Sequence, residues 1–263
     1  MAQIQESTTG GDGLRRVAID PLSRVEGHGK VTLMLDADNK VQQARLHIVE
    51  FRGFEKFIEG RPYWEVPVMV QRLCGICPVS HHLAAAKAMD RVEGAVPVPA
   101  SADRVRRLMH YGQMLQSHAL HFFHLASPDL LFGFDSAATQ RNIVALAQTY
   151  PDIAKKGILL RKYGQEIIRI TSGKRVHGTG AVPGGVNKLL TPDECEFLRR
   201  DLPQMLQWAE DALQLVQRLH EQQPQLYRSF GNFRSNLMSL VRADGGLDFF
   251  DGTLRVRDAD GTI

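Results

Sequence analysis

The sequence has few cysteines, no long hydrophobic run and almost no excess charge of either sign. Its 3 cysteines among 263 residues cannot all pair with one another, so we expect a reducing compartment, the cytoplasm, rather than a disulfide framework. No stretch approaches the roughly 18 uninterrupted apolar residues that a membrane-spanning helix needs. The first 13 residues lack the basic and apolar regions of a signal peptide. The sequence therefore predicts neither a membrane anchor nor a secretory signal.

The charge balance also excludes a class of partner. The formal net charge is +3, and the 32 Lys and Arg residues are interleaved with 29 Asp and Glu residues. Because nucleic-acid binding needs a basic patch or stripe, nucleic acid is not an expected partner. Apolar residues make up 43% of the chain, which is ample for a buried core.

The hydrophobic periodicity predicts an α+β fold that is predominantly helical, with a small antiparallel β element near the N-terminus. We expect a flexible leader over residues 1–16 and a single domain over residues 17–263, because no linker divides the rest. Alternating residues predict a hairpin over 30–36 and 41–49. A strand is expected at 253–257, followed by a turn and the start of a returning strand at 262. Helices are expected over residues 56–59, 64–73, 78–92, 102–125, 139–148, 152–172 and 192–222.

The chemistry of the chain is concentrated in one stretch. Cys74 and Cys77 lie three positions apart, Pro78 follows at an expected helix start, and His81 and His82 fall on the first turns. Two thiolates at this spacing can face one soft metal ion, with imidazole available behind them. We expect the glycine between the cysteines, Gly75, to let the backbone turn closely.

Four interpretations of this cysteine pair compete. Buried cysteines can pack as small hydrophobic side chains, as we expect for Cys195. A structural zinc site would take Cys74, Cys77 and one of His81 or His82, although a second clustered pair is not visible. A redox dithiol would need a βαβ context, which the helical pattern disfavours. The fourth interpretation is a catalytic soft-metal site whose other thiolates lie in another segment.

A family resemblance favours the fourth interpretation. The pattern Arg72-x-Cys74-Gly75-x-Cys77-x-x-x-His81 resembles the first cysteine motif of nickel–iron hydrogenase large subunits. Three further segments resemble that family in the same order along the chain. They are residues 23–28 (SRVEGH), 51–55 (FRGFE) and 177–186, a histidine followed by a Gly-Gly loop. Residues 49–57 and 77–82 look most like the cytoplasmic NAD-reducing type.

The resemblance implies a role for five residues. Cys74 would be a terminal ligand of nickel, and Cys77 would bridge nickel to an iron that also carries carbon monoxide and cyanide. Glu26 would relay the proton produced when hydrogen is split, and Glu55 would bind a magnesium ion near the site. His81 would support the bridging sulfur through a hydrogen bond.

Other polar residues near these motifs have weaker assignments. Arg72 is expected to make polar contacts around the cofactor, and Ser117 stands where many relatives carry an acidic residue. Three histidines, His118, His121 and His124, fall on one face of the expected helix over 102–125. We expect a polar helix face there rather than a metal site.

The resemblance also implies partners and a limit. An iron–sulfur small subunit would carry electrons away, and a module with FMN and iron–sulfur clusters would form NADH. The family's second cysteine motif, DPCxxCxxH, does not occur in these residues. We therefore expect an N-terminal portion that ends before the second CxxC and is not an active enzyme alone. The alternatives are a related quinone-site or coupling subunit of the complex I type and a non-catalytic zinc-binding module.

Overall fold

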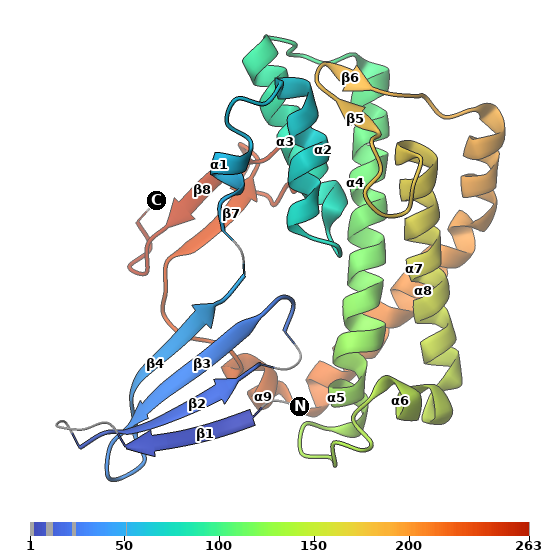
Figure 1. Ribbon diagram of the computed structural model, residues 1–263. Helices are drawn as coiled ribbons and strands as arrows, with labels where there is room; N and C mark the ends of the chain where they lie inside the picture. Colours follow the sequence, from blue (N-terminus) through green and yellow to red (C-terminus); the bar gives the residue numbers. More distant parts are fainter. Residues whose placement is uncertain (1–2, 9–12, 23–24, 51, 263) are drawn as a thin grey trace. The chain divides into compact units, whose positions relative to one another are not determined.

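The computed structural model describes residues 3–8, 13–22, 25–50 and 52–262. The chain folds as two compact units, Met1–Glu59 and Gly60–Ile263, where the sequence predicted one domain from residue 17 onward. Each unit has its own elements (Figure 1). No helix in the described ranges is long and apolar enough to span a bilayer.

The first unit is built on a four-stranded antiparallel sheet in the order β1-β2-β3-β4. Val17 and Ala18 of β2 and Leu35 of β3 are buried, whereas β4 is almost entirely exposed. A short helix, α1 (Phe54–Phe57), follows the sheet. The strands are β1 (Gln3–Thr8), β2 (Arg15–Asp20), β3 (Gly29–Leu35) and β4 (Val41–Ile48).

The turn between β3 and β4 is closed by an aspartate. Oδ1 of Asp36 accepts hydrogen bonds from the backbone N–H groups of Asp38 at 3.0 Å and Lys40 at 2.9 Å. Asn39 adopts a left-handed conformation with φ of 62°, which asparagine tolerates better than most residues. The hairpin predicted from the alternating pattern is confirmed, with register Lys30 to His47.

The first sixteen residues contain more structure than the expected flexible leader. Strand β1 pairs with β2 in antiparallel register, with Gln3 opposite Asp20 and Ser7 opposite Arg16. The segment is polar, and polar residues are tolerated in an edge strand because one of its faces meets solvent. The leader expected from the composition therefore includes a strand, Gln3–Thr8.

The second unit is mostly helical, which confirms the predicted fold class. Helix α3 ends at Gly94, whose φ of 77° stops the helix in a left-handed conformation. Helix α8 begins with a capping box between Thr191 and Glu194. The helical elements are η1 (Tyr63–Glu65), α2 (Val66–Val70), η2 (Gln71–Leu73), α3 (Pro78–Glu93), α4 (Ala100–Leu120), η3 (His121–Ala126), α5 (Ser127–Phe132), α6 (Ile143–Thr149), α7 (Pro151–Ser172), α8 (Pro192–Gln222) and α9 (Pro224–Ser229).

Helices α4 and α7 pack side by side at the centre of this unit (Figure 1). Two glycines make the close approach possible. A Cβ on Gly112 would lie 2.7 Å from Cγ2 of Ile167, and a Cβ on Gly164 would lie 2.7 Å from the carbonyl oxygen of Gly112. Because both distances are shorter than real Cβ contacts, the α4–α7 crossing requires glycine on both helices.

The helix predicted over 102–125 changes its pitch near its end. Helix α4 stops at Leu120, and η3 continues it as a π-helix from His121 to Ala126. Ser127 then donates a hydrogen bond from its hydroxyl to the carbonyl oxygen of Phe122, at the start of α5. The wider turn explains why a simple 3.6-residue period did not predict this boundary.

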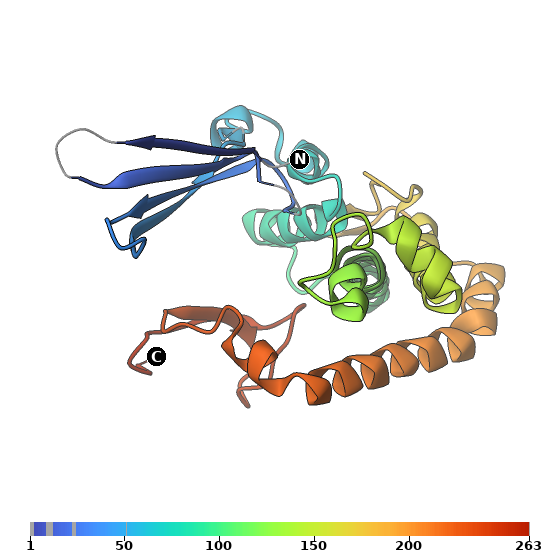
Figure 2. The same cartoon turned by 90° about the horizontal axis from the view of Figure 1, so that it is seen from below.

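The second unit also contains two small antiparallel ladders. Strands β5 (Ala181–Val182) and β6 (Gly185–Val186) form the first, and β7 (Leu237–Val241) pairs with β8 (Thr253–Arg257) in the second. Figure 2 shows α8 leading past the α4–α7 pair toward this second hairpin. The predicted strand at 253–257 is confirmed, but its partner is β7, which precedes it, and not a returning strand at 262.

Candidate metal centre

The cysteine motif spans the break between two helical segments of the second unit. Cys74 directly follows η2, and Cys77 is the N-cap residue of α3, with Pro78 at the first helical position. His81 lies one helical turn after Cys77, so both side chains face the same way. The two Sγ atoms and a ring nitrogen of His81 all lie within 4.8 Å of one another. Within the described ranges, this is the only set of three or more Cys, His, Asp or Glu side chains placed to share a metal ion.

Hydrogen bonds hold the loop between the cysteines in place. The backbone N–H of Cys77 donates to Sγ of Cys74 at 3.2 Å, which joins the two ends of the loop. The side-chain amides of Gln113 and Gln116 both donate to the carbonyl oxygen of Ile76, at 3.1 Å and 3.2 Å. Both glutamines are buried on α4, so they fix the loop to the central helix.

Gly75 does not have the role that the sequence predicted. Its φ is not positive, and a Cβ built on it would meet nothing within 4 Å. The backbone conformation between Cys74 and Cys77 therefore does not require a glycine at position 75.

His82, the second histidine of the pair, is a structural residue. It is 1% exposed, its Nδ1 lies 2.9 Å from the carbonyl oxygen of Pro67, and its Nε2 accepts from the N–H of Ala181 at 3.1 Å. This pattern requires a neutral ring with its proton on Nδ1. Burial lowers the pKa of His82 below its ordinary value. With both nitrogens engaged, His82 has no lone pair for a metal, which leaves His81 as the imidazole of the site.

Arg72 contacts the glycine-rich loop that the sequence analysis placed near the site. Its Nη1 donates to Nδ1 of His177 at 3.1 Å, which joins segments 105 residues apart in the chain. The ring of His177 must then carry its proton on Nε2, a buried atom for which no hydrogen-bond partner is found among the described residues. His177 also has a positive φ of 52°, which is unusual for a residue with a side chain.

Sequence reasoning missed a buried ion pair that fixes the same glycine-rich loop. Asp90 of α3 and Arg106 of α4 form two hydrogen bonds, at 2.6 Å and 3.1 Å, and both side chains are at most 5% exposed. Arg106 also donates to the carbonyl oxygens of Val182 and Gly185, and Asp90 accepts from the N–H of Gly184. The sequence does contain a signal for this pair, because each of the two helices carries a charged residue on its apolar face. Charged residues are rarely buried unless they are paired.

The predicted proton-relay residue Glu26 lies in the first unit. It is exposed, on a loop that Leu22 N–H closes by donating to the carbonyl oxygen of Gly29 at 2.9 Å. The adjacent His28 places its Nδ1 2.6 Å from a carboxylate oxygen of Glu50, and this hydrogen bond lowers the pKa of Glu50. Ser23 and Arg24 of the same motif lie outside the described residues.

The predicted magnesium ligand Glu55 also belongs to the first unit. It lies in the first turn of α1, its side chain is 71% exposed, and Oε1 is 3.7 Å from Nη2 of Arg52. Among the described residues, this carboxylate is not part of any cluster that could hold an ion. Its magnesium role stays a prediction.

The three histidines at the end of α4 do not form a metal site within the described chain. Nδ1 of His118 donates to the carbonyl oxygen of Met114 at 2.8 Å, and His121 is exposed in the π-helix. Burial lowers the pKa of His124. The polar helix face stays a prediction.

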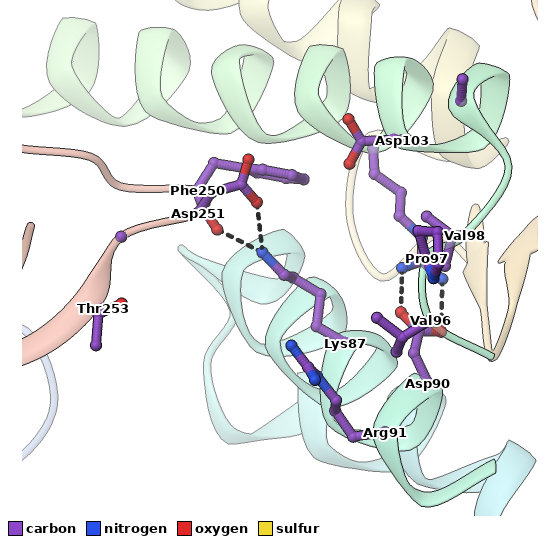
Figure 3. Close-up of a pocket in the computed structure, with 13 residues that line it drawn as sticks. Lys87, Asp90, Arg91, Val96, Pro97, Val98, Asp103, Phe250, Asp251 and Thr253 are labelled. Atoms are coloured by element: carbon purple, nitrogen blue, oxygen red, sulfur yellow. Dashed lines mark hydrogen bonds and ion pairs between the residues drawn. The ribbon is translucent and has the colours of Figure 1, made fainter. Parts of the chain in front are cut away.

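A cavity of about 590 Å³ lies between α3, the start of α4 and residues 250–253. Figure 3 shows Lys87 reaching toward Phe250 and Asp251, with Asp103 on the opposite helix. Lys87 donates to the carbonyl oxygen of Phe250 and lies 3.2 Å from Asp251. No residue of the segment from Cys74 to His81 lines this cavity, so it is not part of the candidate metal centre.

Two family models match consecutive parts of the chain. A HoxL-like family model matches residues 16–51, and a nickel-dependent hydrogenase model matches residues 52–157. The chain is 45% identical over 257 residues to the NAD-reducing hydrogenase HoxS subunit beta of Cupriavidus necator, covering 94% of this chain and 53% of that protein. It is also 45% identical over 246 residues to one subunit of the F420-non-reducing hydrogenase vhu of Methanocaldococcus jannaschii, covering 94% and 58%.

A solved structure, that of an NAD+-reducing NiFe hydrogenase in the H2-reduced state, has a TM-score of 0.90 and 59% identity, covering 96% of this chain and 56% of that one. The chain belongs to the nickel-dependent hydrogenase family. The predicted resemblance and the hydrogenase large-subunit fold are thereby confirmed. The chain spans about half the length of the curated relatives it matches.

The donor set fits a soft metal group of the kind that a nickel-dependent hydrogenase carries. Thiolate sulfur and imidazole nitrogen are the protein ligands that nickel and related transition metals prefer. Cys74 and Cys77 are each partly exposed. They supply two of the four thiolates that the resemblance implies.

Proposed function

We propose that this chain is part of the catalytic large subunit of a nickel–iron hydrogenase, and that the whole enzyme cleaves or forms H2. The observation that carries the proposal is the convergence of Cys74, Cys77 and His81 within 4.8 Å in a chain of this family. In this proposal Cys74 and Cys77 would hold the nickel–iron group through their sulfur atoms. When bound, the metal pair supplies the redox chemistry by which H2 is split heterolytically.

The protein residues then orient ligands and move protons. His81 is proposed to donate a hydrogen bond to the sulfur of Cys77, which orients that ligand. Glu26 is proposed to accept the proton at a carboxylate oxygen and pass it outward, as a general base does. Glu55 is proposed to hold a magnesium ion, for which carboxylate oxygen is a suitable ligand. Arg72 supports the cysteine loop through His177.

The electron acceptor is the finer part of the proposal. The 59% identical solved structure is that of an NAD+-reducing hydrogenase, and one of the two 45% identical relatives is named as NAD-reducing. The other relative is named as an F420-non-reducing hydrogenase. We propose the NAD-reducing type in the cytoplasm. Its proposed partners are an iron–sulfur small subunit, which takes up electrons, together with a module that contains FMN and iron–sulfur clusters.

Metal analysis and infrared spectroscopy of the assembled enzyme that contains this chain test the proposal. We expect nickel together with iron, and absorption bands from carbonyl and cyanide groups. Zinc as the sole metal would refute it in favour of a zinc-binding module. A related coupling subunit of the complex I type would contain no nickel, and the retained cysteine pair counts against it. Reduction of NAD+ by H2 tests the acceptor.

The proposed relay has its own test in Glu26→Gln of the assembled enzyme. The amide cannot take up a proton, so we expect unchanged metal content and a loss of hydrogen–deuterium exchange of about 100-fold or more, the usual scale for a general base. Glu6→Gln, on strand β1, is the matched control and should leave exchange unchanged. Unaltered exchange in Glu26→Gln would assign the relay to another residue.

A further inference from the structure

Helix α8 has more apolar surface than its contacts in this chain cover. Of its 31 residues, all of which lie within the described ranges, only Leu198 is buried. Leu198 and three partly buried residues pack on α7 and η3, and we call these four residues the inner row: Leu198, Met205, Trp208 and Ala212. The inner row attaches α8 to the rest of the second unit and leaves its other apolar residues without such a contact.

A second line of apolar residues runs along the exposed side of α8. We call it the outer stripe, and its members are Leu202, Leu206, Ala209, Leu213 and Val216. Leu202, Leu206, Leu213 and Val216 are 41%, 55%, 60% and 41% exposed, and Ala209 is exposed as well. Exposed apolar residues are normal when they are scattered singly, whereas a contiguous apolar patch marks an interaction surface. The outer stripe therefore indicates a face of α8 that another element covers.

The spacing of the outer stripe fits a second helix. Its residues follow one another at intervals of four, three, four and three positions. This repeat keeps one line of side chains facing a neighbouring helix. A strand would not match it, because the side chains of a strand recur on one face at every second residue. From Leu202 to Val216 the stripe is about 21 Å long, so the matching partner is a helix of about four turns.

Few charges border the outer stripe on the side away from the inner row. At the helical spacing of 3.6 residues per turn, the neighbours on that side are Pro203, Gln207, Glu210, Gln214 and Gln217. Only Glu210 among them is charged. Helices that choose among separate chains commonly carry charged flanking residues, which set the partner. Their scarcity here favours a permanent contact inside one subunit, since such contacts are more hydrophobic.

An apolar cavity lies next to the start of the outer stripe. It has a volume of about 440 Å³ and lies between α4, α7 and α8. Leu202 of the stripe lines it, together with Leu115 of α4 and Ile167 of α7. Tyr111, which also lines the cavity, is 53% exposed. The cavity and the stripe share Leu202 and form one continuous apolar surface, so a partner helix on the stripe can place a large side chain in the cavity.

We propose that the outer stripe is covered by a helix from the half of the large subunit that lies outside this chain. The chain spans 53% and 58% of two curated relatives and 56% of the chain of the solved structure. About half of such a subunit is therefore available to pack against it. The scarcity of bordering charges also fits a contact within one subunit. The inference rests on the proposed function only in placing this chain in a hydrogenase large subunit, and it does not involve the metal.

Hydroxyl-radical footprinting of the unmodified, assembled enzyme tests whether the outer stripe is covered. Mass spectrometry measures how fast each side chain is oxidised, and this rate reports its contact with solvent. We expect Leu206 and Leu213 to lose most of their oxidation relative to the urea-unfolded subunit. If both leucines are oxidised in the assembled enzyme as fast as in the unfolded subunit, the stripe is exposed and the proposal is overturned.

Photocrosslinking identifies the occupant. Leu206 or Leu213 is replaced in the assembled enzyme by the photoreactive residue p-benzoylphenylalanine, and we expect a crosslink within the large subunit to a peptide from outside residues 1–263. The matched control is the same replacement of Gln204, an exposed residue on the opposite side of α8, which should not crosslink to that peptide. A crosslink to the iron–sulfur subunit or to a second copy of the large subunit would overturn the proposed occupant. Footprinting needs no substitution, so it decides where a crosslinking variant does not assemble.

The two proposals fail separately. An exposed outer stripe in an enzyme that contains nickel and iron would overturn this inference and leave the proposed function unaffected. Conversely, an assembled enzyme without nickel would refute the proposed function, whereas protection of Leu206 and Leu213 and their crosslinks would still support the contact.

Discussion

Replacing Asp90 with alanine isolates the contribution of the buried ion pair between α3 and α4. The substitution leaves the guanidinium of Arg106, which is 2% exposed, without its anionic partner. It also removes the acceptor for the N–H of Gly184. Breaking a buried pair in this way costs about 3–5 kcal/mol. Because Arg106 keeps the carbonyl oxygens of Val182 and Gly185, we expect a loss near the lower limit, about 3 kcal/mol.

Urea unfolding followed by circular dichroism measures this loss in the second unit. With a urea dependence of roughly 2–3 kcal/mol per molar for a unit of this size, the midpoint should fall by about 1 M or more at an unchanged slope. Hydrogen exchange at the amide of Gly184 gives a local measure, and its protection should be lost. Asp90→Asn keeps an oxygen for Gly184 and should be less destabilising than alanine.

The control is an ion pair of the same residue types on the surface. Arg200 and Asp201 lie 2.9 Å apart, but their side chains are 63% and 42% exposed. Solvent screens such a pair, so Asp201→Ala should leave the urea midpoint within error. If Asp90→Ala shifts the midpoint no more than Asp201→Ala does, the buried pair is not what holds the glycine-rich hairpin to α3 and α4.

Three further predictions concern other contacts of the second unit. Because burial lowers the pKa of His82, the unfolded chain takes up a proton at mildly acidic pH that the folded chain does not. This contribution to the free energy of unfolding is complete above pH 6.5 and falls as the pH drops below it. Thermal unfolding from about pH 8 to about pH 5 should show the fall, and His82→Gln should be less sensitive to acid. Gly164→Ala should lower the free energy of unfolding by about 1–3 kcal/mol, because the added methyl group overpacks the crossing of α4 and α7. Gly75→Ala should leave the urea midpoint unchanged, because a Cβ there meets nothing within 4 Å. Equal effects of the two substitutions would contradict the argument that α4 and α7 need glycine where they cross. Replacing Gln113 and Gln116 together by leucine should free the carbonyl of Ile76 and lower the nickel content of the assembled enzyme while preserving helical content. An unchanged nickel content would show that the loop is fixed by other contacts.

The sequence was informative wherever structure depends on local pattern. The helices near residues 78–92, 152–172 and 192–222 were predicted almost to their ends, because amphipathic periodicity is a local signal. The hairpin closed by Asp36 was predicted for the same reason. Strand β1 was missed because its polar sequence is stabilised by pairing with β2, and this pairing is not visible in the strand's own residues.

The ligand types of the candidate site were also predictable, since thiolates and imidazole at this spacing favour one kind of ion. The residue types alone left the choice between His81 and His82 open, and the family resemblance assigned His81. Adjacent histidines on a helix point in different directions, and only the contacts of His82 with Pro67 and Ala181 show which one faces the protein interior. Ala181 is 99 residues away in the chain, so no local pattern contains this information.

Long-range contacts of this kind explain how a loop without regular structure can present two thiolates in fixed positions. Its carbonyl at Ile76 is bound by α4, Arg72 before it is bound to His177, and His82 after it is bound to Ala181. All three contacts reach segments at least 37 residues away. The arrangement of the two cysteine side chains is therefore a product of the folded second unit rather than of the CxxC sequence. A short peptide with the same motif would have to order this loop before its two sulfurs could share one metal ion.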